Sequence, residues 1–236
     1  MKNLEYKETF RITTNMLDCN DSLKLSEILD IAQNIAGDHA EHLGIGFTPF
    51  INKGWIWVVV RNRVEIVKDI KSIKEIEAET YAINPRFIEF PREIILRSNG
   101  EEFAKIEQVW MILNINTKQL VGPKELEEFH SSKPPLFASR TKKLPLIPKE
   151  QLKFNSKFVV PYSMIDHNKH LNNTRYLDLY LNLYKNDNFV SFQAEYINQA
   201  FLDDELSLYT FKNDKQNYFY VYKDDTLIFY CLVNTK

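Results

Sequence analysis

Glycine, cysteine and long apolar runs are scarce in this sequence, and each shortage excludes a class of protein. The 236 residues include 6 glycines and 2 cysteines. Two cysteines cannot form the disulfide framework of a small secreted domain, and nothing resembles a metal knuckle, so we expect no metal and no cofactor. No apolar run reaches the roughly 20 residues that a membrane-spanning helix needs. Residues 1–8 lack the apolar stretch of a signal peptide, and together these features favour the cytoplasm.

Charge of either sign is not in excess. The chain has 30 lysines and arginines against 32 aspartates and glutamates, for a formal net charge of −2. Proteins that bind nucleic acids usually carry an excess of basic residues, so we expect no nucleic-acid binding. Apolar residues make up 44% of the chain, which is enough to bury the core of one large domain or two small ones.

The first half of the sequence predicts a strand, a long helix and then several strands. Apolar residues between Ser22 and Leu43 recur at steps of three and four, which is typical of one face of a helix. Gly44 follows this pattern and predicts its end. The strand-like runs are residues 4–14, 55–67, 75–83, 87–97 and 102–115. Asn99-Gly100 separates the last two runs and predicts a tight hairpin.

The second half repeats this order after a stretch rich in proline. Residues 131–150 contain four prolines and are interpreted as a basic linker. The elements expected after it are a strand at 154–162, a helix at 171–184 and strands at 189–197, 206–212, 218–223 and 226–233. All glycines precede residue 123, so Asn and Asp are expected to form the later turns. A helix followed by antiparallel strands in each half indicates an α+β fold.

Two segments of the chain align without gaps at an offset of 148 residues. The identities pair Phe10, Met16, Asp18, Asn20 and Leu23 with Phe158, Met164, Asp166, Asn168 and Leu171. Both segments lie between the first strand and the helix of their half, so we interpret them as an internal duplication. The shared Asp and Asn are interpreted as caps of the helix that follows. The informative difference is His170, which replaces Ser22 of the first copy.

His170 is predicted to lie at the N-terminus of the second helix. Free backbone N–H groups and the helix dipole favour a developing negative charge there, and an imidazole is a general base near neutral pH. A thiol leaves readily, with a pKa of about 8.5, so a thioester is a suitable substrate for one base and one polarising helix end. A solvated histidine in a polar turn is the alternative interpretation. No chemistry is assigned to His39, His42, His130 or His167; the first two are expected to be partly charged at a helix C-terminus.

The segment from Asp166 to Asn173, followed by Tyr176, resembles the active-site motif of acyl-acyl-carrier-protein thioesterases. Residues 54–61, 99–101 and 109–114 are similar to strands and a hairpin of the same family. The family is a tandem of two hotdog folds, each a long helix wrapped by a curved antiparallel sheet. The resemblance therefore implies three parts. They are an N-terminal hotdog at 1–130 without a catalytic histidine, the linker at 131–150 and a catalytic hotdog at 151–236.

The resemblance implies hydrolysis of a fatty acyl thioester on acyl carrier protein, in fatty acid biosynthesis. Asn168 and His170 match the catalytic Asn and His of the family, and Asp166 matches the acidic residue that orients the Asn. Gln199 stands where the family usually has a Glu on the next strand, and glutamine cannot accept a proton. His170 is then the expected base. A slow enzyme, a non-catalytic acyl-thioester binder and an acyl-coenzyme A thioesterase stay open as alternatives.

The resemblance also implies that the first half provides the acyl tunnel. The candidate substrate-binding residues are Trp55, Trp57, Ile28 and Ala32, with Asn172 and Asn173 of the motif. Ordinary core packing is the alternative for each lining residue. Acyl carrier proteins are acidic, so a basic face would favour docking. Its candidates are Arg61, Arg63, Arg140, Lys142 and Lys143. A tandem already pairs two hotdog units, so a monomer and a homodimer are both open.

Overall fold

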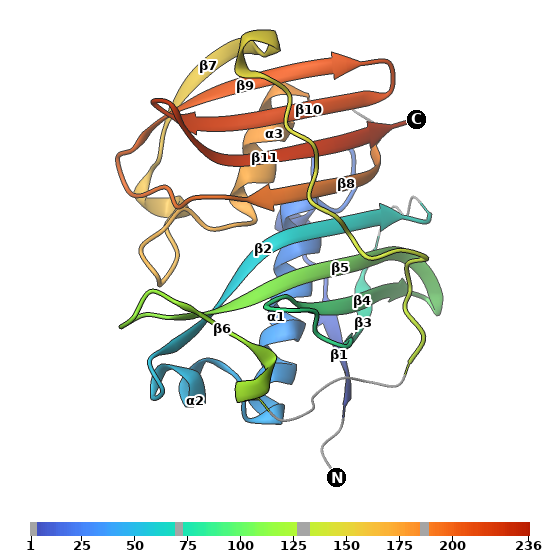
Figure 1. Cartoon of the computed structure of the whole chain (residues 1–236). Coiled ribbons are helices and arrows are strands. Elements are labelled where there is room, and N and C mark those ends of the chain that lie inside the picture. Colours follow the sequence, from blue (N-terminus) through green and yellow to red (C-terminus); the bar gives the residue numbers. More distant parts are fainter. Residues whose placement is uncertain (1–3, 69–72, 127–132, 185–188) are drawn as a thin grey trace. The chain divides into compact units, whose positions relative to one another are not determined.

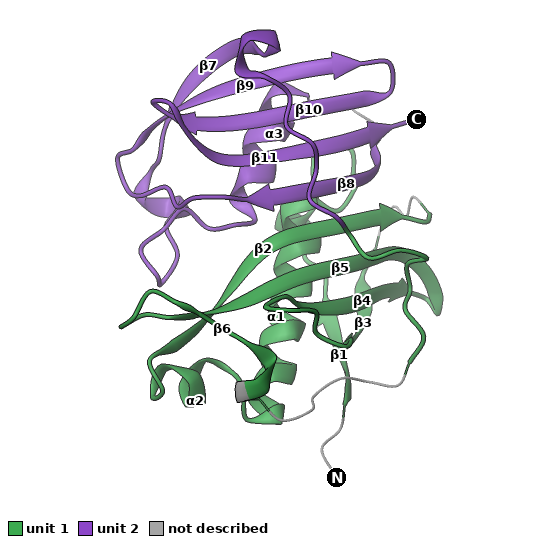
Figure 2. Cartoon of the chain, in the orientation of Figure 1, with its two compact units in different colours: residues 1–141 green, residues 142–236 purple. Residues whose placement is uncertain are grey.

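The computed structural model describes residues 4–68, 73–126, 133–184 and 189–236. In each half of the chain a helix lies against antiparallel strands (Figure 1). The chain divides into two compact units, residues 1–141 and 142–236 (Figure 2). This confirms the predicted α+β class of tandem helix-and-sheet units. None of the helices in the described part of the chain has the length and apolar character needed to cross a bilayer.

The first unit is an antiparallel sheet with one long helix. Its elements are β1 (Glu5–Arg11), α1 (Leu25–Leu43), α2 (Phe47–Ile51), β2 (Trp55–Ile66), β3 (Glu75–Ala82), β4 (Phe90–Ser98), β5 (Glu101–Asn114) and β6 (Leu120–Val121), with 3-10 turns η1 (Thr14–Met16) and η2 (Pro123–Glu125). The strand order is β1-β3-β4-β5-β2, and β6 pairs with β5. Asn99 and Gly100 have φ of 52° and 78° and form the predicted hairpin between β4 and β5.

Helix α1 packs its apolar face on the sheet, where it contacts β1 and β3. It ends as predicted at Gly44, which has a φ of 75° and whose N–H donates to the carbonyl of Glu41 (2.9 Å). Its start differs from the prediction, because α1 begins at Leu25 and Ser22 belongs to a hydrogen-bonded loop before it. Lys24 is the N-cap residue, and its side chain makes no capping hydrogen bond.

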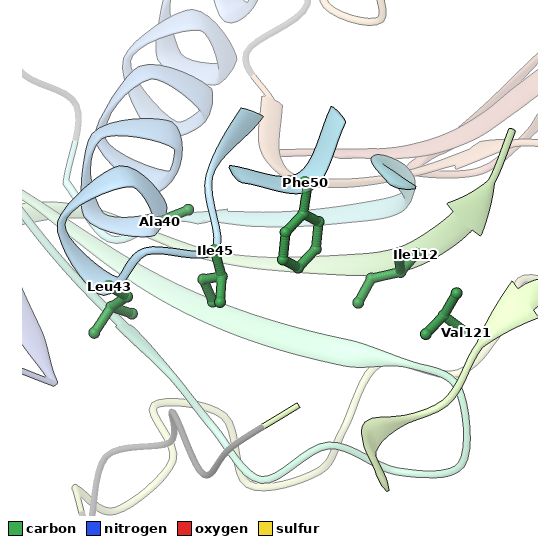
Figure 3. Close-up of a cluster of buried hydrophobic side chains, with 6 residues drawn as sticks. All are labelled: Ala40, Leu43, Ile45, Phe50, Ile112 and Val121. Atoms are coloured by element: carbon green, nitrogen blue, oxygen red, sulfur yellow. The ribbon is translucent and has the colours of Figure 1, made fainter. Parts of the chain in front are cut away.

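A cluster of apolar side chains fills the space between the end of α1, α2, β5 and β6 (Figure 3). Its buried members are Ala40, Leu43, Ile45, Phe50, Ile112 and Val121. Phe50 is 1% exposed; its ring stacks on Trp57 (centroids 5.2 Å apart) and meets Trp55 edge-on (5.6 Å). The indole N–H of Trp57 donates to the carbonyl of Ile45 (2.7 Å). Both tryptophans are therefore packed as parts of this core.

The second unit repeats the arrangement with a shorter helix. Its elements are β7 (Lys153–Val159), α3 (Arg175–Leu183), β8 (Phe189–Tyr196), β9 (Glu205–Asn213), β10 (Gln216–Lys223) and β11 (Thr226–Thr235), with 3-10 turns η3 (Lys149–Gln151) and η4 (Tyr162–Met164). The strand order is β8-β11-β10-β9-β7. Asp214 and Asp224 have φ of 41° and 52° at two hairpins, which confirms that aspartate makes these turns. Tyr176 of α3 stacks on Phe229 of β11 (4.6 Å).

The structure confirms the internal duplication. Strand β7 begins and ends 148 residues after β1, and η4 begins and ends 148 residues after η1. This is the offset at which the two sequence segments align. Leu17 and Leu23 form an isolated antiparallel bridge in the first unit, and Ile165 and Leu171 form the corresponding bridge in the second.

Residues 133–141 of the predicted linker pack on the sheet of the first unit. The N–H of Leu136 donates to Glu93 (2.8 Å), and the N–H of Thr141 donates to Glu107 (3.1 Å). These carboxylates face each other across β4 and β5 and are 1% and 2% exposed. A buried carboxylate without hydrogen bonds is costly, so this segment completes the unit and does not simply connect it to the next.

Residues 142–150 bind the second unit in the same way. The N–H of Leu144 donates to the buried carboxylate of Glu195 (3.0 Å), and its carbonyl accepts from the hydroxyl of Tyr230 (2.9 Å). The N–H of Ile147 donates to the hydroxyl of Tyr220 (2.9 Å). Burial raises the pKa of Tyr220 to about 12, and the bond from Ile147 opposes this only partly, so the phenol stays neutral.

Candidate active site

The candidate site lies in the loop between η4 and α3, and Asp166 organises its main chain. One carboxylate oxygen of Asp166 accepts hydrogen bonds from the N–H groups of Asn168 (2.8 Å) and His170 (3.2 Å). The N–H of Asp166 donates back to the carbonyl of His170 (2.9 Å) and closes the loop. Lys169 has a φ of 66°, which lets the chain reverse between the two functional candidates. Asn168 and His170 are thus fixed in one tight turn.

The first unit builds the same loop with a different side chain at its end. Asp18 accepts from the N–H groups of Asn20 (2.8 Å) and Ser22 (3.0 Å), and its own N–H donates to the carbonyl of Ser22 (2.8 Å). Asp21 takes the left-handed conformation, with a φ of 59°. The aspartate therefore holds a loop in both units and does not cap the following helix, so the capping interpretation is wrong. Ser22 occupies the position of His170.

Helix α3 begins five residues after His170, so the predicted helix from residue 171 is wrong at its start. The side chain of Asn172 accepts from the N–H (3.0 Å) and the hydroxyl (3.1 Å) of Thr174 and competes with helix formation there. The N–H groups of Arg175 and Leu177 donate to the carbonyls of Asn172 and Thr174. His170 therefore does not lie at a helix N-terminus, and three amide groups near that end already have acceptors.

The segment after β8 comes to the side of this loop. The N–H of Leu171 donates to the carbonyl of Ala200 (2.8 Å). The phenyl ring of Phe201 meets the half-buried imidazole of His170 edge-to-face, with centroids 5.1 Å apart and planes at 79°. Gln199 immediately precedes these residues and is exposed. It lies beyond Tyr196, the last residue of β8, so its predicted place on a strand is wrong. Its segment is nevertheless hydrogen-bonded to the histidine loop through Ala200.

A buried tyrosine lies near the acidic residues of the site. Burial raises the pKa of Tyr176, and the carboxylates of Asp204 and Asp166 add to the effect. The phenol is therefore neutral at physiological pH. Tyr176 is 2% exposed and stacks on Phe229, so it packs the start of α3 against β11.

Known proteins resemble this chain in sequence and in fold. Residues 3–127 match the model of the acyl-ACP thioesterase N-terminal domain. The chain belongs to the acyl-ACP thioesterase family. It is 24% identical over 188 residues to the chloroplastic palmitoyl-acyl carrier protein thioesterase of Arabidopsis thaliana, a match that covers 74% of this chain and 46% of that protein. The chain thus spans about half the length of the curated relatives it matches.

Two solved thioesterase structures share the fold over nearly the whole chain. An acyl-ACP thioesterase from Bacteroides thetaiotaomicron superposes with a TM-score of 0.88 and 19% identity, covering 98% of both chains. The 12:0-ACP thioesterase from Umbellularia californica gives 0.87 and 16%, covering 100% of this chain and 98% of that one. At these identities the superpositions show the fold alone, and they confirm the predicted hotdog architecture.

The acyl-binding candidates of this thioesterase-family chain lie in the core of the first unit. Ile28 and Ala32 are 3% and 0% exposed on the packed face of α1, whereas Trp55 and Trp57 are half-buried beside Phe50. In the second unit, the side-chain oxygen of Asn172 accepts hydrogen bonds from Thr174. Asn173 is half-buried in the turn before α3.

Two of the basic residues predicted for a docking face make contacts within the first unit. Arg61 is 6% exposed and donates to the carbonyl of Thr141 (3.3 Å). Arg63 donates to the carbonyl of Ser139 (3.3 Å), and its guanidinium lies over the ring of Phe137 (4.4 Å). Both are held against the segment 133–141, and their role in docking stays a prediction. Three exposed candidates remain, namely Arg140, Lys142 and Lys143.

Sequence reasoning missed a buried polar cluster under α1. His39 is 0% exposed, and its Nδ1 lies 2.7 Å from a guanidinium nitrogen of Arg92, which also donates to Thr80 (3.1 Å). Because a guanidinium only donates, Nδ1 of His39 accepts, so the predicted partial charge on His39 is wrong. Burial lowers the pKa of Arg92 to about 10. His39 falls on the apolar face of the helical pattern, and this position was the signal in the sequence that it is buried. His130 lies outside the described residues.

Proposed function

We propose that this chain hydrolyses the thioester between a fatty acyl chain and acyl carrier protein. Membership of the acyl-ACP thioesterase family supports the proposal. The observation that carries it is the contrast at the end of the two loops, which share one backbone arrangement but carry His170 in the second unit and Ser22 in the first. The second unit is accordingly the catalytic one, and the first contributes to acyl-chain binding.

His170 acts as the general base in this proposal. The neutral imidazole takes a proton from a water molecule as the water oxygen attacks the thioester carbonyl carbon. The tetrahedral intermediate then breaks its C–S bond, and the imidazolium returns the proton to the departing sulfur. The products are a free fatty acid and the thiol of the carrier. A thiol with a pKa of about 8.5 leaves readily, so one proton carrier suffices.

Asn168 is the proposed donor to the oxyanion. Its side chain is exposed in the same turn as His170, and a preorganised amide N–H stabilises the negative charge that develops on the carbonyl oxygen. The N–H groups of Thr174 and Arg175 already donate within the loop, so the start of α3 contributes less to stabilising the oxyanion than Asn168 does. Asp166 supports both residues by holding their main-chain N–H groups.

Gln199 motivates the competing function. A glutamine amide can form hydrogen bonds but accepts no proton, so a chain with this residue fits a slow hydrolase or a binder of acyl thioesters without turnover. Hydrolysis of coenzyme A thioesters is the other alternative, because these substrates present the same thioester group to the same base. We also propose a cytoplasmic location, which is suggested by the two free cysteines.

Release of thiol from matched substrates separates these functions. Acyl-carrier-protein and acyl-coenzyme A series of the same chain lengths are followed with a thiol-reactive dye. His170→Ala is expected to lower kcat by about 10²- to 10⁴-fold, whereas Ser22→Ala, its counterpart in the first unit, leaves kcat unchanged. Asn168→Ala and Asn20→Ala form a second matched pair.

Each alternative has its own result. Tight binding of an acyl-carrier protein without thiol release supports the binder and removes the hydrolase. A higher kcat/KM for the coenzyme A series than for the carrier-protein series supports the hydrolysis of coenzyme A thioesters. A rate that survives His170→Ala refutes the mechanism.

A further inference from the structure

Phe201 is 45% exposed, and its ring lies against the imidazole of His170. A polar turn holds it there. The N–H of Phe201 donates to a carboxylate oxygen of Asp204 (2.9 Å), and the N–H of Asp204 donates to the carbonyl of Phe201 (3.2 Å). The second carboxylate oxygen of Asp204 binds the ammonium of Lys223 on β10 (2.6 Å). The position of the ring is thereby tied to the sheet.

Further main-chain bonds fix both ends of this turn. On one side the carbonyl of Ala200 accepts from Leu171, the residue next to His170. On the other side the N–H of Val160 donates to the carbonyl of Asp204, and the carbonyl of Val160 accepts from Asp203, both at 3.0 Å. The turn therefore moves little relative to the histidine loop, because a shift would break bonds at both ends.

We infer that Phe201 is a positioning residue, which fixes the orientation of the His170 imidazole, and that Asp204 and Lys223 hold Phe201 in place. The inference rests on the proposed function. The main chain of His170 is pinned by Asp166, so rotation about its side-chain bonds is the remaining freedom of the ring. An edge-to-face contact removes the rotamers that would collide with the phenyl ring. A base must point at its water, so loss of this constraint lowers kcat more than it changes KM.

The second unit contains a matched control for this contact. Phe154 is 50% exposed and meets Tyr209 edge-to-face, with centroids 5.5 Å apart and planes at 69°. Its partner has no part in the proposed chemistry. Replacing either phenylalanine by alanine removes a similar ring from a similar contact, so a general loss of packing affects both variants, whereas loss of positioning affects Phe201→Ala alone.

Kinetics of the full chain give the first test. Phe201→Ala is expected to lower kcat by about 10- to 100-fold with KM changed less than about twofold. Phe201→Tyr keeps the ring and retains the rate, and Phe154→Ala behaves as the wild type. Lys223→Met loosens the turn and gives a smaller fall than Phe201→Ala. Wild-type kcat in Phe201→Ala, or equal losses in Phe201→Ala and Phe154→Ala, overturns the inference.

The imidazole resonances of His170 give a test that does not depend on turnover. They are assigned by comparison with His170→Ala in a spectrum of isotopically labelled histidine. Phe201→Ala is expected to shift them and to broaden them through rotamer exchange, while Phe154→Ala leaves them in place. Unchanged resonances in Phe201→Ala overturn the inference at any level of activity. If no substrate releases thiol, the proposed function fails, and if His170→Ala keeps the full rate, the proposed mechanism fails. In both cases these resonances still decide whether Phe201 orients the ring.

Discussion

The duplicated loop makes it possible to separate what an aspartate does for structure from what it does for chemistry. Asp166 and Asp18 each accept two main-chain hydrogen bonds, at 2.8 and 3.2 Å in the second unit and at 2.8 and 3.0 Å in the first. Replacing either by alanine removes the same two bonds. We therefore predict equal losses of stability in Asp166→Ala and Asp18→Ala, but a loss of activity in the former alone.

The size of the stability loss follows from the environment of these bonds. A shielded hydrogen bond to a charged group contributes about 1.5–3 kcal/mol, and a partly exposed loop retains roughly half of that. Two bonds then contribute about 2 kcal/mol to the free energy of unfolding. In a chain of this length that amounts to a fall in Tm of about 4–8 °C. Asp166→Ala also frees the loop that carries His170, for which we expect a fall in kcat of about 10- to 100-fold.

Thermal unfolding and thiol release, measured on the same preparations, test both halves of the prediction. Asp166→Asn is the decisive control, because its amide oxygen still accepts both N–H groups but carries no charge. We expect it to keep most of the stability and most of the rate. If Asp166→Asn unfolds like the wild type but loses as much activity as Asp166→Ala, the charge of Asp166 acts on the reaction directly. If Asp18→Ala loses as much activity as Asp166→Ala, the assignment of chemistry to the second unit is refuted.

Three further predictions concern acid stability, the first core and the substituted glutamine. Burial opposes ionisation of Glu79, but hydrogen bonds from Lys133 and Arg97 outweigh it and lower its pKa to about 2 from 4.5. The ionised form of Glu79 thus stabilises the fold above pH 4.5, and about 3 kcal/mol of this is lost as the pH falls from 4.5 towards 2. In acid titrations Glu79→Gln is expected to flatten this dependence of stability on pH. Phe50→Ala is expected to cost about 3–5 kcal/mol in urea unfolding, and a loss below about 1 kcal/mol would show that the cluster of Figure 3 collapses around the cavity. Gln199→Glu is expected to raise kcat roughly tenfold by stabilising the imidazolium, and an unchanged kcat would show that glutamine suffices.

Much of the fold is predictable because its signals are local. The end of α1 follows from Gly44, whose lack of a side chain suits a φ of 75°. The turns at Asp214 and Asp224 follow from a half without glycine, where aspartate takes the left-handed conformation. The repeat is detectable because five identities share one offset. Each of these features can be recognised from short stretches of the sequence.

The features that escaped prediction depend on contacts between distant residues. Proline in the stretch 131–150 predicts a linker, but its described residues supply donors to buried carboxylates such as Glu93, and no local pattern records which carboxylates are buried. Arg61 has the sequence character of a surface residue and is buried by Thr141, 80 positions away. His39 is neutral because Arg92, on another element, donates to it. In each example a partner distant in the chain decides the environment.

The start of α3 shows how one side chain reshapes the second copy. At the offset of 148 residues, the first residue of α1, Leu25, corresponds to Asn173, yet α3 begins two residues later at Arg175. The position before it is Lys24 in the first copy and Asn172 in the second. The ammonium of Lys24 only donates and binds the carbonyl of Asn15 (2.6 Å), whereas the amide oxygen of Asn172 accepts from Thr174 and delays the helix. The copy with His170 therefore also has a longer loop before its helix, while the aspartate makes the same two main-chain bonds in both copies.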